Sequence, residues 1–533
     1  MSEVLLINPP HPFREGVPVP LSLTYLGAVL EEDGFEVDSL DLLVSSFSPE
    51  KVREKISSTD PQIVGITSVT RTYPISVEIL KYCKEANPSV KTVIGGPHVT
   101  FTAEETLQES PWVDFVVRGE GEYTFRELSN RIVDDGDPFS VDGIAYRNER
   151  RNVIFTGERG LIEDLDELPF PKRSLMPLSK YRSLGSRCGV ITSRGCPFGC
   201  VFCVAPKMFG EEVRFRSPDL VVDEIEEILD LGFEINLADD TFTLNHDHVY
   251  SILDEILDRG LEFEWTANAR VDTVDRDLLK RMKEAGCNTV FYGVESGNPE
   301  VLEKSGKGIN LEQVERAVEL SKDVGLDVIT SYILGLPGEN RETLQETLDF
   351  ADQIGTKHTV HVLAPLPGTP LYENREEYGI ELISEDWKRI NADEPVTRVI
   401  TEDGVLSPGE LENALDDYLQ RSGESLEDSR EEAEDGNEEA KKKVEKWDRL
   451  EFLTSVLQKD LIEKYGRIKL ETEENLDLER SARLMENELL DEFEDYYFSI
   501  KNELIKQVEE GNLSTSVLSE EGDRFLVWDW KEF

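Results

Sequence analysis

The first 135 residues alternate between short apolar runs and amphipathic segments. The runs have the length of strands, and the segments repeat their apolar positions with the spacing of a helix. The runs are VLLIN at 4–8, VDSLDLL at 37–43, IVGIT at 63–67, TVIGG at 92–96 and DFVV at 114–117. This rhythm predicts a flavodoxin-like (Rossmann-like) α/β domain over residues 1–138, with an open parallel sheet and helices on both faces. A connector over 139–185 follows, with a hairpin predicted at 143–157.

The same rhythm restarts near Cys188 with a longer repeat. Six strand-like runs, from GVITSRG at 189–195 to TVHVLAP at 359–365, alternate with amphipathic helical segments. These units predict a partial (β/α)6 TIM-type barrel over residues 186–395. Because the active site of such a barrel lies at the carboxyl ends of its strands, we expect functional residues there.

Acidic residues far outnumber basic ones along the whole chain. Lys and Arg total 57 against 111 Asp and Glu, a formal net charge of −54, which would repel nucleic acids and anionic membranes. Solvated carboxylates at this density are typical of salt-loving archaea, where concentrated salt screens their repulsion. Beyond about Val396 the strand patterns fade, and residues 396–533 are predicted to form an acidic, mainly helical region. Nine acids and two bases at 421–440 predict a disordered insertion there.

The chain shows neither a membrane-spanning run nor a secretory leader. No segment approaches the roughly 18 consecutive apolar residues that a membrane-spanning helix needs. The start, MSEVLLINPP, lacks a charged region followed by a cleavage site. The six cysteines are too few and too unevenly spaced for a disulfide framework. These features predict a cytoplasmic protein without a transmembrane segment.

Three of the six cysteines lie within eight residues. Cys196, Cys200 and Cys203 have the spacing C-x-x-x-C-x-x-C, in a loop with Gly and Pro that follows a predicted strand. Three thiolates can bind three irons of a four-iron cluster and leave the last iron open to another ligand. A zinc site or a redox pair is the alternative. Structural zinc needs a fourth ligand, however, and Cys188 would be an awkward one.

From about Cys188 to Tyr372 the chain resembles the radical S-adenosylmethionine (SAM) superfamily, which has this cysteine spacing. The resemblance implies that SAM binds the open iron of a [4Fe-4S] cluster, and that one electron then cleaves SAM to a 5′-deoxyadenosyl radical. A low-potential donor such as ferredoxin or flavodoxin would supply the electron. The resemblance also implies SAM contacts at successive strand ends: Phe202, Asp239, Asp240, Arg270, Glu295, Ser296, Gly335 and Pro337.

The same resemblance implies a role for each of these contacts. Phe202 would lie against adenine. Asp239 and Asp240 would hold the SAM ammonium group, although D-D-x-F stands here in place of the commoner G-G-E. Arg270 would meet the SAM carboxylate, and the residues on the fourth and fifth strands would meet the methionine, the ribose and the adenine.

Small residues occupy the strand ends of the first predicted domain, where ligands of open α/β sheets bind. No G-x-G-x-x-G follows the first strand, so a dinucleotide is not favoured. The string from Gly95 to Phe125, GGPHVTFTAEETL…DFVVRGEGEYTF, is similar to the cobalamin-binding domain that precedes the barrel in a large radical SAM subgroup. That subgroup includes methyltransferases acting on unreactive carbon and a porphyrin-ring cyclase. The residues expected to contact cobalamin are Pro10, Thr67, Ser68, Gly95, Gly96, His98, Arg118, Gly119, Glu120 and Glu122.

One motif of other cobalamin proteins is missing. The D-x-H-x-x-G motif, which supplies a histidine to cobalt, does not follow the first strand. His98 is the nearest candidate ligand, and a hydrogen-bonded loop histidine is the other interpretation. For the whole domain, the alternative is a degenerate flavodoxin-like module that serves packing or substrate binding.

Together these features predict an enzyme that acts on a small-molecule or lipid-like substrate. The SAM-derived radical would abstract hydrogen from an unactivated carbon, after which methylcobalamin would donate a methyl group. Cobalamin-dependent oxidative cyclisation or ring rearrangement is an alternative that shares every motif. A non-catalytic sensor that binds cobalamin or an iron–sulfur cluster is an alternative of another class.

Overall fold

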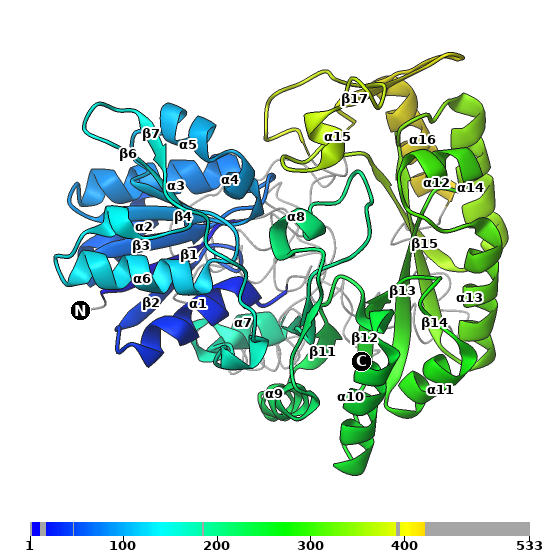
Figure 1. Cartoon of the computed structure of the whole chain (residues 1–533), viewed down its shortest axis with the longest axis horizontal. Coiled ribbons are helices and arrows are strands. Elements are labelled where there is room, and N and C mark those ends of the chain that lie inside the picture. Colours follow the sequence, from blue (N-terminus) through cyan, green and yellow to red (C-terminus); the bar gives the residue numbers. More distant parts are fainter. Residues whose placement is uncertain (1–2, 11–17, 46, 184–185, 391–394, 422–533) are drawn as a thin grey trace, which may run out of the picture.

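The described part of the chain forms two α/β bodies that lie side by side. Figure 1 shows the N-terminal body in blue and cyan, the second body in green, and the short helix α8 (Ala205–Phe209) between them. The predicted helical region beyond residue 421, including the predicted insertion, lies outside the described residues. The computed structural model describes residues 3–10, 18–45, 47–183, 186–390 and 395–421.

The N-terminal sheet has seven strands in the order β2-β1-β3-β4-β5-β6-β7. Its first five strands are parallel, as the sequence predicts. The predicted hairpin at 143–157 is not a separate connector element, because its first strand pairs antiparallel with β5 and so extends the sheet. The strands are β1 (Val4–Asn8), β2 (Val37–Asp41), β3 (Ile63–Thr67), β4 (Lys91–Gly95), β5 (Phe115–Val117), β6 (Ile144–Arg147) and β7 (Val153–Phe155).

Helices cover both faces of this sheet. Along β1 successive side chains point to opposite faces, so Val4 and Leu6 pack with α1 and α6, while Leu5 and Ile7 pack with α2 and α3. Burial on both faces explains why β1 is apolar from Val4 to Ile7. The helices are α1 (Leu21–Glu32), α2 (Pro49–Thr59), α3 (Tyr73–Ala86), α4 (Pro97–Phe101), α5 (Ala103–Glu109) and α6 (Glu122–Val133).

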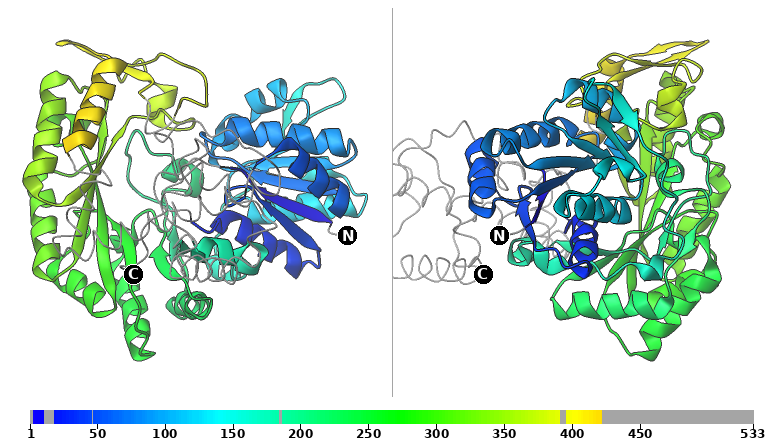
Figure 2. Two further views of the ribbon diagram at one scale, coloured as in Figure 1. Left: turned by 180° about the vertical axis from the view of Figure 1, so that it is seen from behind. Right: turned by 60° about the vertical axis from the view of Figure 1, so that its left-hand side comes forward.

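The second body contains the six-stranded parallel sheet that the sequence predicts. Its strands run in the order β15-β14-β13-β12-β11-β8, so that β8 and β15 are the two edges of an open barrel. Helices α13 and α14 lie on the outer side of this sheet, away from the N-terminal body (Figures 1 and 2). The strands are β8 (Arg187–Val190), β11 (Glu234–Leu237), β12 (Trp265–Ala269), β13 (Cys287–Glu295), β14 (Asp327–Leu334) and β15 (Lys357–Val362). The helices are α9 (Pro218–Asp230), α10 (His246–Asp258), α11 (Arg276–Glu284), α12 (Pro299–Lys304), α13 (Leu311–Asp323) and α14 (Arg341–Ile354).

Shorter elements connect the two bodies and follow the barrel. The expectation that strands end near Val396 is wrong, because β17 and β18 come directly after this residue and pair with β16 in an antiparallel sheet. Helix α16 then packs on the barrel, where Tyr418 Oη donates to the carbonyl of His358 at 2.5 Å. The shorter elements are α7 (Leu178–Ser183), β9 (Ser193–Arg194), β10 (Arg214–Phe215), α15 (Pro370–Glu373), β16 (Ile380–Leu382), β17 (Thr397–Thr401), β18 (Gly404–Leu406) and α16 (Pro408–Arg421). Four 3-10 turns complete the set: Pro138–Ser140, Leu165–Glu167, Arg173–Leu175 and Phe242–Leu244.

A buried ionic triad fixes the connector to the barrel. Glu224 on α9 accepts from Arg173 and from Arg216, each at 2.5 Å, and no side chain of the three is more than 4% exposed.

Among the helices that the structure describes, none combines the length and the apolar character needed to cross a membrane.

Candidate functional site

The cysteine loop between β9 and α8 is held by close backbone contacts. Gly195 has a φ of +110°, and a Cβ atom there would lie 2.6 Å from the carbonyl oxygen of Glu212, so only glycine fits before Cys196. At the other side of the loop, the amide of Val201 donates to the carbonyl of Ser305 at 2.9 Å. The loop is therefore fixed both to its own hairpin and to the segment that follows α12.

The three thiols of this loop lie close together and differ in exposure. Cys200 is buried, whereas Cys196 and Cys203 are partly accessible, and all three are free of disulfides. Burial, together with the neighbouring thiols, raises the pKa of Cys203 to about 11. Burial also raises the pKa of Cys200, while Lys307 and Arg270 lower it.

The donor set of the loop fits a cluster with one open iron. Within the described residues, no three His, Cys, Asp or Glu side chains are placed to hold a single metal ion. Each thiolate of a four-iron cluster binds a different iron, so these sulfur atoms need not converge on one point. Cys188, the fourth ligand that zinc would need, is buried beside Arg173 instead.

Arg270 is fixed against the cysteine loop. Its guanidinium lies 3.5 Å from the ring centroid of Phe198, which stands between Cys196 and Cys200. It also donates two hydrogen bonds of 2.9 Å to Asp272 and one of 2.9 Å to the carbonyl of Lys307. The Arg270 side chain therefore packs against the cysteine loop, and its guanidinium is already hydrogen-bonded within the protein.

Asp239 and Asp240, predicted as a pair, have different surroundings. Asp239 is 1% exposed, and its oxygens accept from the amides of Thr192 and Ser193 and from the Thr192 hydroxyl at 2.7–2.8 Å. The expectation that Asp239 holds a ligand ammonium group is corrected, because these bonds engage both oxygens in fixing the strand before the cysteine loop. Asp240 lines the cavity between the two bodies, and burial raises the pKa of its carboxyl.

Glu295 is brought beside the cysteine loop in an uncommon backbone conformation. Its φ is +72°, and the register of β13 against β14 shifts at this point. Its carboxylate accepts from Nζ of Lys307 at 2.8 Å, and both side chains are almost fully buried. A Cβ atom on Gly293 would lie 2.4 Å from Oε1 of Glu295, so a side chain there would displace this carboxylate. No sequence motif pointed to Lys307, which joins Glu295 to the surroundings of Cys200.

The remaining predicted SAM residues have mixed placements. Phe202 is half-buried in the cysteine loop. Ser296 turns toward α14, where its hydroxyl lies 2.9 Å from that of Thr347, so it does not join the group around the loop. Gly335 and Pro337 lie buried in the turn after β14, and Gly335 donates its amide to Glu339.

Glu339 gives this turn a pH-dependent stability. Its carboxyl is fully buried with Oε1 unpaired, and burial raises its pKa to about 8. The folded protein therefore retains a proton that the unfolded chain releases, so stability from this group is full at low pH and declines as the pH rises toward and through 8.

The variant Glu339→Gln keeps the shape of the protonated acid without titrating. We expect its unfolding free energy, relative to the unaltered protein, to increase with pH by up to about 1.4 kcal/mol per unit between the ordinary glutamate pKa and 8, then level off. Chemical denaturation of both proteins from pH 5 to 9 measures this. Two parallel stability profiles would contradict it.

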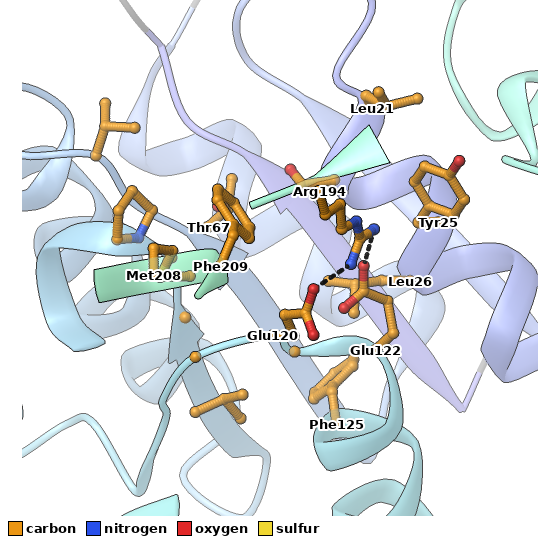
Figure 3. Close-up of a pocket in the computed structure, with 18 of the residues that line it drawn as sticks. Leu21, Tyr25, Leu26, Thr67, Glu120, Glu122, Phe125, Arg194, Met208 and Phe209 are labelled. Atoms are coloured by element: carbon orange, nitrogen blue, oxygen red, sulfur yellow. Dashed lines mark hydrogen bonds and ion pairs between the residues drawn. The ribbon is translucent and has the colours of Figure 1, made fainter. Parts of the chain in front are cut away.

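A cavity lies between the carboxyl ends of the N-terminal strands and the barrel (Figure 3). The space free of atoms is about 1300 Å³, counting the open mouth. Small residues and apolar side chains form the N-terminal wall, whereas β9, α8 and the end of β11 form the other. Six residues predicted to contact cobalamin line this cavity: Thr67, Gly95, Gly96, Gly119, Glu120 and Glu122.

Glycines at the strand ends, which carry no side chain, allow close packing beside the cavity. Gly96 has a φ of +104°, and a Cβ atom there would lie 2.4 Å from the carbonyl oxygen of Ser68. Gly65, also in the wall, faces Phe125, whose Cζ would lie 2.8 Å from an added Cβ. A wide cavity lined by small and apolar residues fits the flat face of a corrin.

Four predicted cobalamin contacts do not line the cavity: Pro10, Ser68, His98 and Arg118. Ser68 lies behind Gly96 and donates to the carbonyl of Gly95 at 3.2 Å. Arg118 turns toward β7, where its guanidinium lies 5.1 Å from the ring centroid of Phe155. The four expectations are corrected, since none of these residues lines the cavity, and the side chains of Ser68 and Arg118 are directed to neighbours outside its wall.

His98 belongs to an aromatic cluster rather than to the cavity. Its ring lies 4.2 Å from that of Tyr73 and 4.7 Å from that of Trp387, and Nδ1 lies 3.1 Å from the Thr70 hydroxyl. Burial lowers its pKa to about 3. The expectation of His98 as candidate cobalt ligand is corrected, because α4 directs the imidazole into this cluster.

The placement of His98 predicts that cobalamin binding survives its loss. We expect His98→Phe to change the Kd for cobalamin by less than about threefold and to lower the unfolding free energy by about 1 kcal/mol through loss of the Thr70 contact. Titration followed by the cobalamin absorption spectrum measures the first, and thermal denaturation the second. Thr70→Val, which removes the same contact but keeps the imidazole, is the control. A changed spectrum of bound cobalamin in His98→Phe alone would restore the ligand role.

Two family models match the chain. The B12 binding domain matches residues 14–129, and the radical SAM superfamily matches residues 190–351. An uncharacterised methyltransferase of Pyrococcus horikoshii is 38% identical over 384 residues, 71% of this chain and 83% of that protein. The anaerobic magnesium-protoporphyrin IX monomethyl ester cyclase of Rubrivivax gelatinosus is 36% identical over 345 residues, 62% of this chain and 61% of the cyclase.

Solved structures share the fold of both bodies. OxsB, a cobalamin-dependent SAM radical enzyme with aqua-cobalamin and SAM bound, aligns with a TM-score of 0.67 at 19% identity, covering 99% of this chain and 82% of OxsB. The methyltransferase TsrM from Kitasatospora setae, with cobalamin and a [4Fe-4S] cluster, aligns with a TM-score of 0.61 at 22% identity, covering 78% and 82%. The chain therefore belongs to the radical SAM superfamily: it is an enzyme that uses a [4Fe-4S] cluster and SAM, and it carries an N-terminal B12-binding domain.

Proposed function

We propose that this enzyme transfers a methyl group to an unactivated carbon of a small-molecule or lipid-like substrate, with cobalamin in the cavity between its two bodies. The observation that carries this proposal is that one segment, from β9 to β10, bears the three cysteines and also forms a wall of that cavity. A methyl-carrying cofactor there would lie next to the site of radical formation. Both cofactors could then act on one substrate.

The relatives favour methylation over cyclisation. The methyltransferase of P. horikoshii and cytidylyl-2-hydroxyethylphosphonate methyltransferase of Streptomyces wedmorensis are matched over 83% and 86% of their lengths, the latter at 28% identity. The R. gelatinosus cyclase is matched over only 61% of its length. The chain therefore spans more of the length of these two methyltransferases than of this cyclase.

We assign the residues of the site as follows. Cys196, Cys200 and Cys203 hold the cluster, which with SAM supplies a 5′-deoxyadenosyl radical. Arg270 and Lys307 place positive charge beside Cys200, the buried cysteine of the loop, which favours the thiolate form of Cys200. The apolar lining of the cavity excludes water from the reacting groups.

Four assignments complete the SAM site: Phe202 and the turn residues Gly335 and Pro337 for adenine, and Asp240 for the ammonium group. Asp240 is preferred over Asp239 because Asp240 lines the cavity, whereas both oxygens of Asp239 are engaged by Thr192 and Ser193. Glu295 contributes through its ion pair with Lys307, which lies beside the cysteine loop.

Two wider proposals rest on composition and chemistry. A ferredoxin or flavodoxin supplies the low-potential electron, because SAM cleavage consumes one and the chain shows no second cluster motif. The protein acts in the cytoplasm of a salt-loving archaeon, supported by its 111 acidic against 57 basic residues.

The test is the fate of SAM in the anaerobically purified, cluster-loaded protein. With reductant and cobalamin but no substrate, we expect stoichiometric release of S-adenosylhomocysteine, since the SAM methyl group passes to the cofactor. Without cobalamin only 5′-deoxyadenosine should form. Formation of 5′-deoxyadenosine alone under both conditions would point to cyclisation or rearrangement, and formation of neither product would favour a sensor.

A further inference from the structure

Four buried charged side chains join the two bodies at the edge of the cavity. Glu120 and Glu122 follow β5, whereas Arg194 ends β9 and Arg214 begins β10. Arg194 donates to Glu120 at 3.0 Å and to Glu122 at 2.6 Å, as the dashed lines in Figure 3 show. Arg214 binds both oxygens of Glu120 at 2.8 and 3.0 Å. We call these four residues the interdomain ion cluster.

The interdomain ion cluster is almost fully buried, and its members are closely hydrogen-bonded. Its side chains are 2–11% exposed, and Glu120 also accepts from the amide of Ile162 at 2.7 Å. Burial alone would raise the pKa of Glu120, but its bonds with Arg214 and Arg194 hold it below the ordinary value. A buried ionic group adds little stability over apolar packing, but separating its partners is strongly destabilising, which favours the arrangement of the two bodies that pairs all four charges. This cluster therefore sets how the two bodies meet.

The same geometry links the cavity to the cysteine loop. Arg194 stands two residues before Cys196, and its backbone pairs with Arg214 in the β9–β10 hairpin that encloses the loop. Three of the four members also line the cavity, as do Met208 and Phe209 of α8. A group that enters the cavity therefore meets side chains whose position depends on the cysteine loop.

We infer that Arg194 is a positioning residue that couples the two cofactor sites, so that loading the iron–sulfur cluster tightens cobalamin binding. Thermodynamic linkage makes the effect reciprocal, and bound cobalamin stabilises the loaded loop by the same factor. The inference rests on the proposed occupation of the cavity by cobalamin. It adds a role for a residue that touches neither the iron ligand atoms nor the SAM residues named above.

The test compares cobalamin affinity with and without the cluster. Hydroxocobalamin is titrated anaerobically into the full-length protein, first cluster-loaded and then stripped by a chelator. We expect the loaded form to bind on the order of 5- to 150-fold more tightly, the usual range of coupling between sites. In the double variant Arg194→Gln, Glu122→Gln, which removes one charge of each sign, this ratio should fall toward one.

A matched control separates coupling from general damage. Arg173→Gln removes an equally buried arginine from the ionic triad on Glu224, which does not line the cavity, and leaves Glu224 paired with Arg216. Its affinity ratio should equal that of the unaltered protein. As a second readout, cobalamin should change the electron paramagnetic resonance spectrum of the reduced cluster in the control but not in the double variant.

Each outcome decides the inference. An unchanged ratio in the double variant, or an equal fall in Arg173→Gln, would overturn it while leaving the proposed function intact. If the unaltered protein binds hydroxocobalamin in neither form, the assignment of the cavity fails and the coupling fails with it. Circular dichroism of every variant establishes that the comparison is made between folded proteins.

Discussion

Replacing Cys196, Cys200 and Cys203 together by alanine is expected to abolish both iron binding and SAM cleavage. The iron content of the reconstituted protein should fall from about four per chain to background, because three thiolates are the only protein ligands of such a cluster. Release of 5′-deoxyadenosine on reduction should fall below detection. Iron analysis, absorption spectra and chromatography of the products measure these effects.

Two other cysteines provide matched controls. Cys83 packs in the core of the N-terminal body, and Cys287 is 1% exposed at the start of β13. Both lie outside the cysteine loop, and burial raises the pKa of both thiols to about 12. Alanine at either position should leave iron content and SAM cleavage unchanged. Retention of a four-iron cluster in the triple variant would refute the assignment of the loop.

Val69→Trp is expected to block the cavity and to lower cobalamin affinity by at least about 100-fold. Val69 is 42% exposed although it is apolar, and its side chain lines the cavity. An indole there would occupy space that a corrin needs, without displacing buried neighbours. The cluster should be unaffected, since its loop lies on the opposite wall. Titration with hydroxocobalamin and iron analysis of the same sample measure both effects.

The chain offers a close control for this substitution. Val405 on β18 is 44% exposed and does not line the cavity. Val405→Trp therefore adds the same surface indole and should bind cobalamin like the unaltered protein. Normal binding by Val69→Trp would show that cobalamin sits elsewhere and would remove the main support for the proposed methyl transfer.

The two substitutions address independent parts of the proposal. The triple cysteine variant is expected to lose the cluster and to bind cobalamin more weakly only by the coupling factor inferred above. Loss of cobalamin binding with a normal cluster is expected for Val69→Trp. If both variants lost both cofactors, the two sites would be less separable than the cavity and the loop indicate.

The sequence by itself determined the parallel strands of the two sheets and the cysteine loop. Strand and helix periodicities are local, because they record which side of an element meets apolar neighbours. The runs at 4–8 and 63–67 are strands for that reason, and the six runs after Cys188 form the six barrel strands in chain order. The spacing of three cysteines within eight residues is equally local.

Only the tertiary structure decided which side chains reach the sites. Arg194 and Glu120 are 74 residues apart in sequence, and no local pattern relates them. The adjacent acids Asp239 and Asp240 look equivalent in sequence, yet only one faces the cavity. His98 turns away because Trp387, from beyond the barrel, packs against its ring. Side-chain direction depends on the register and packing of distant elements, so local patterns give the elements but not the residues that meet between them.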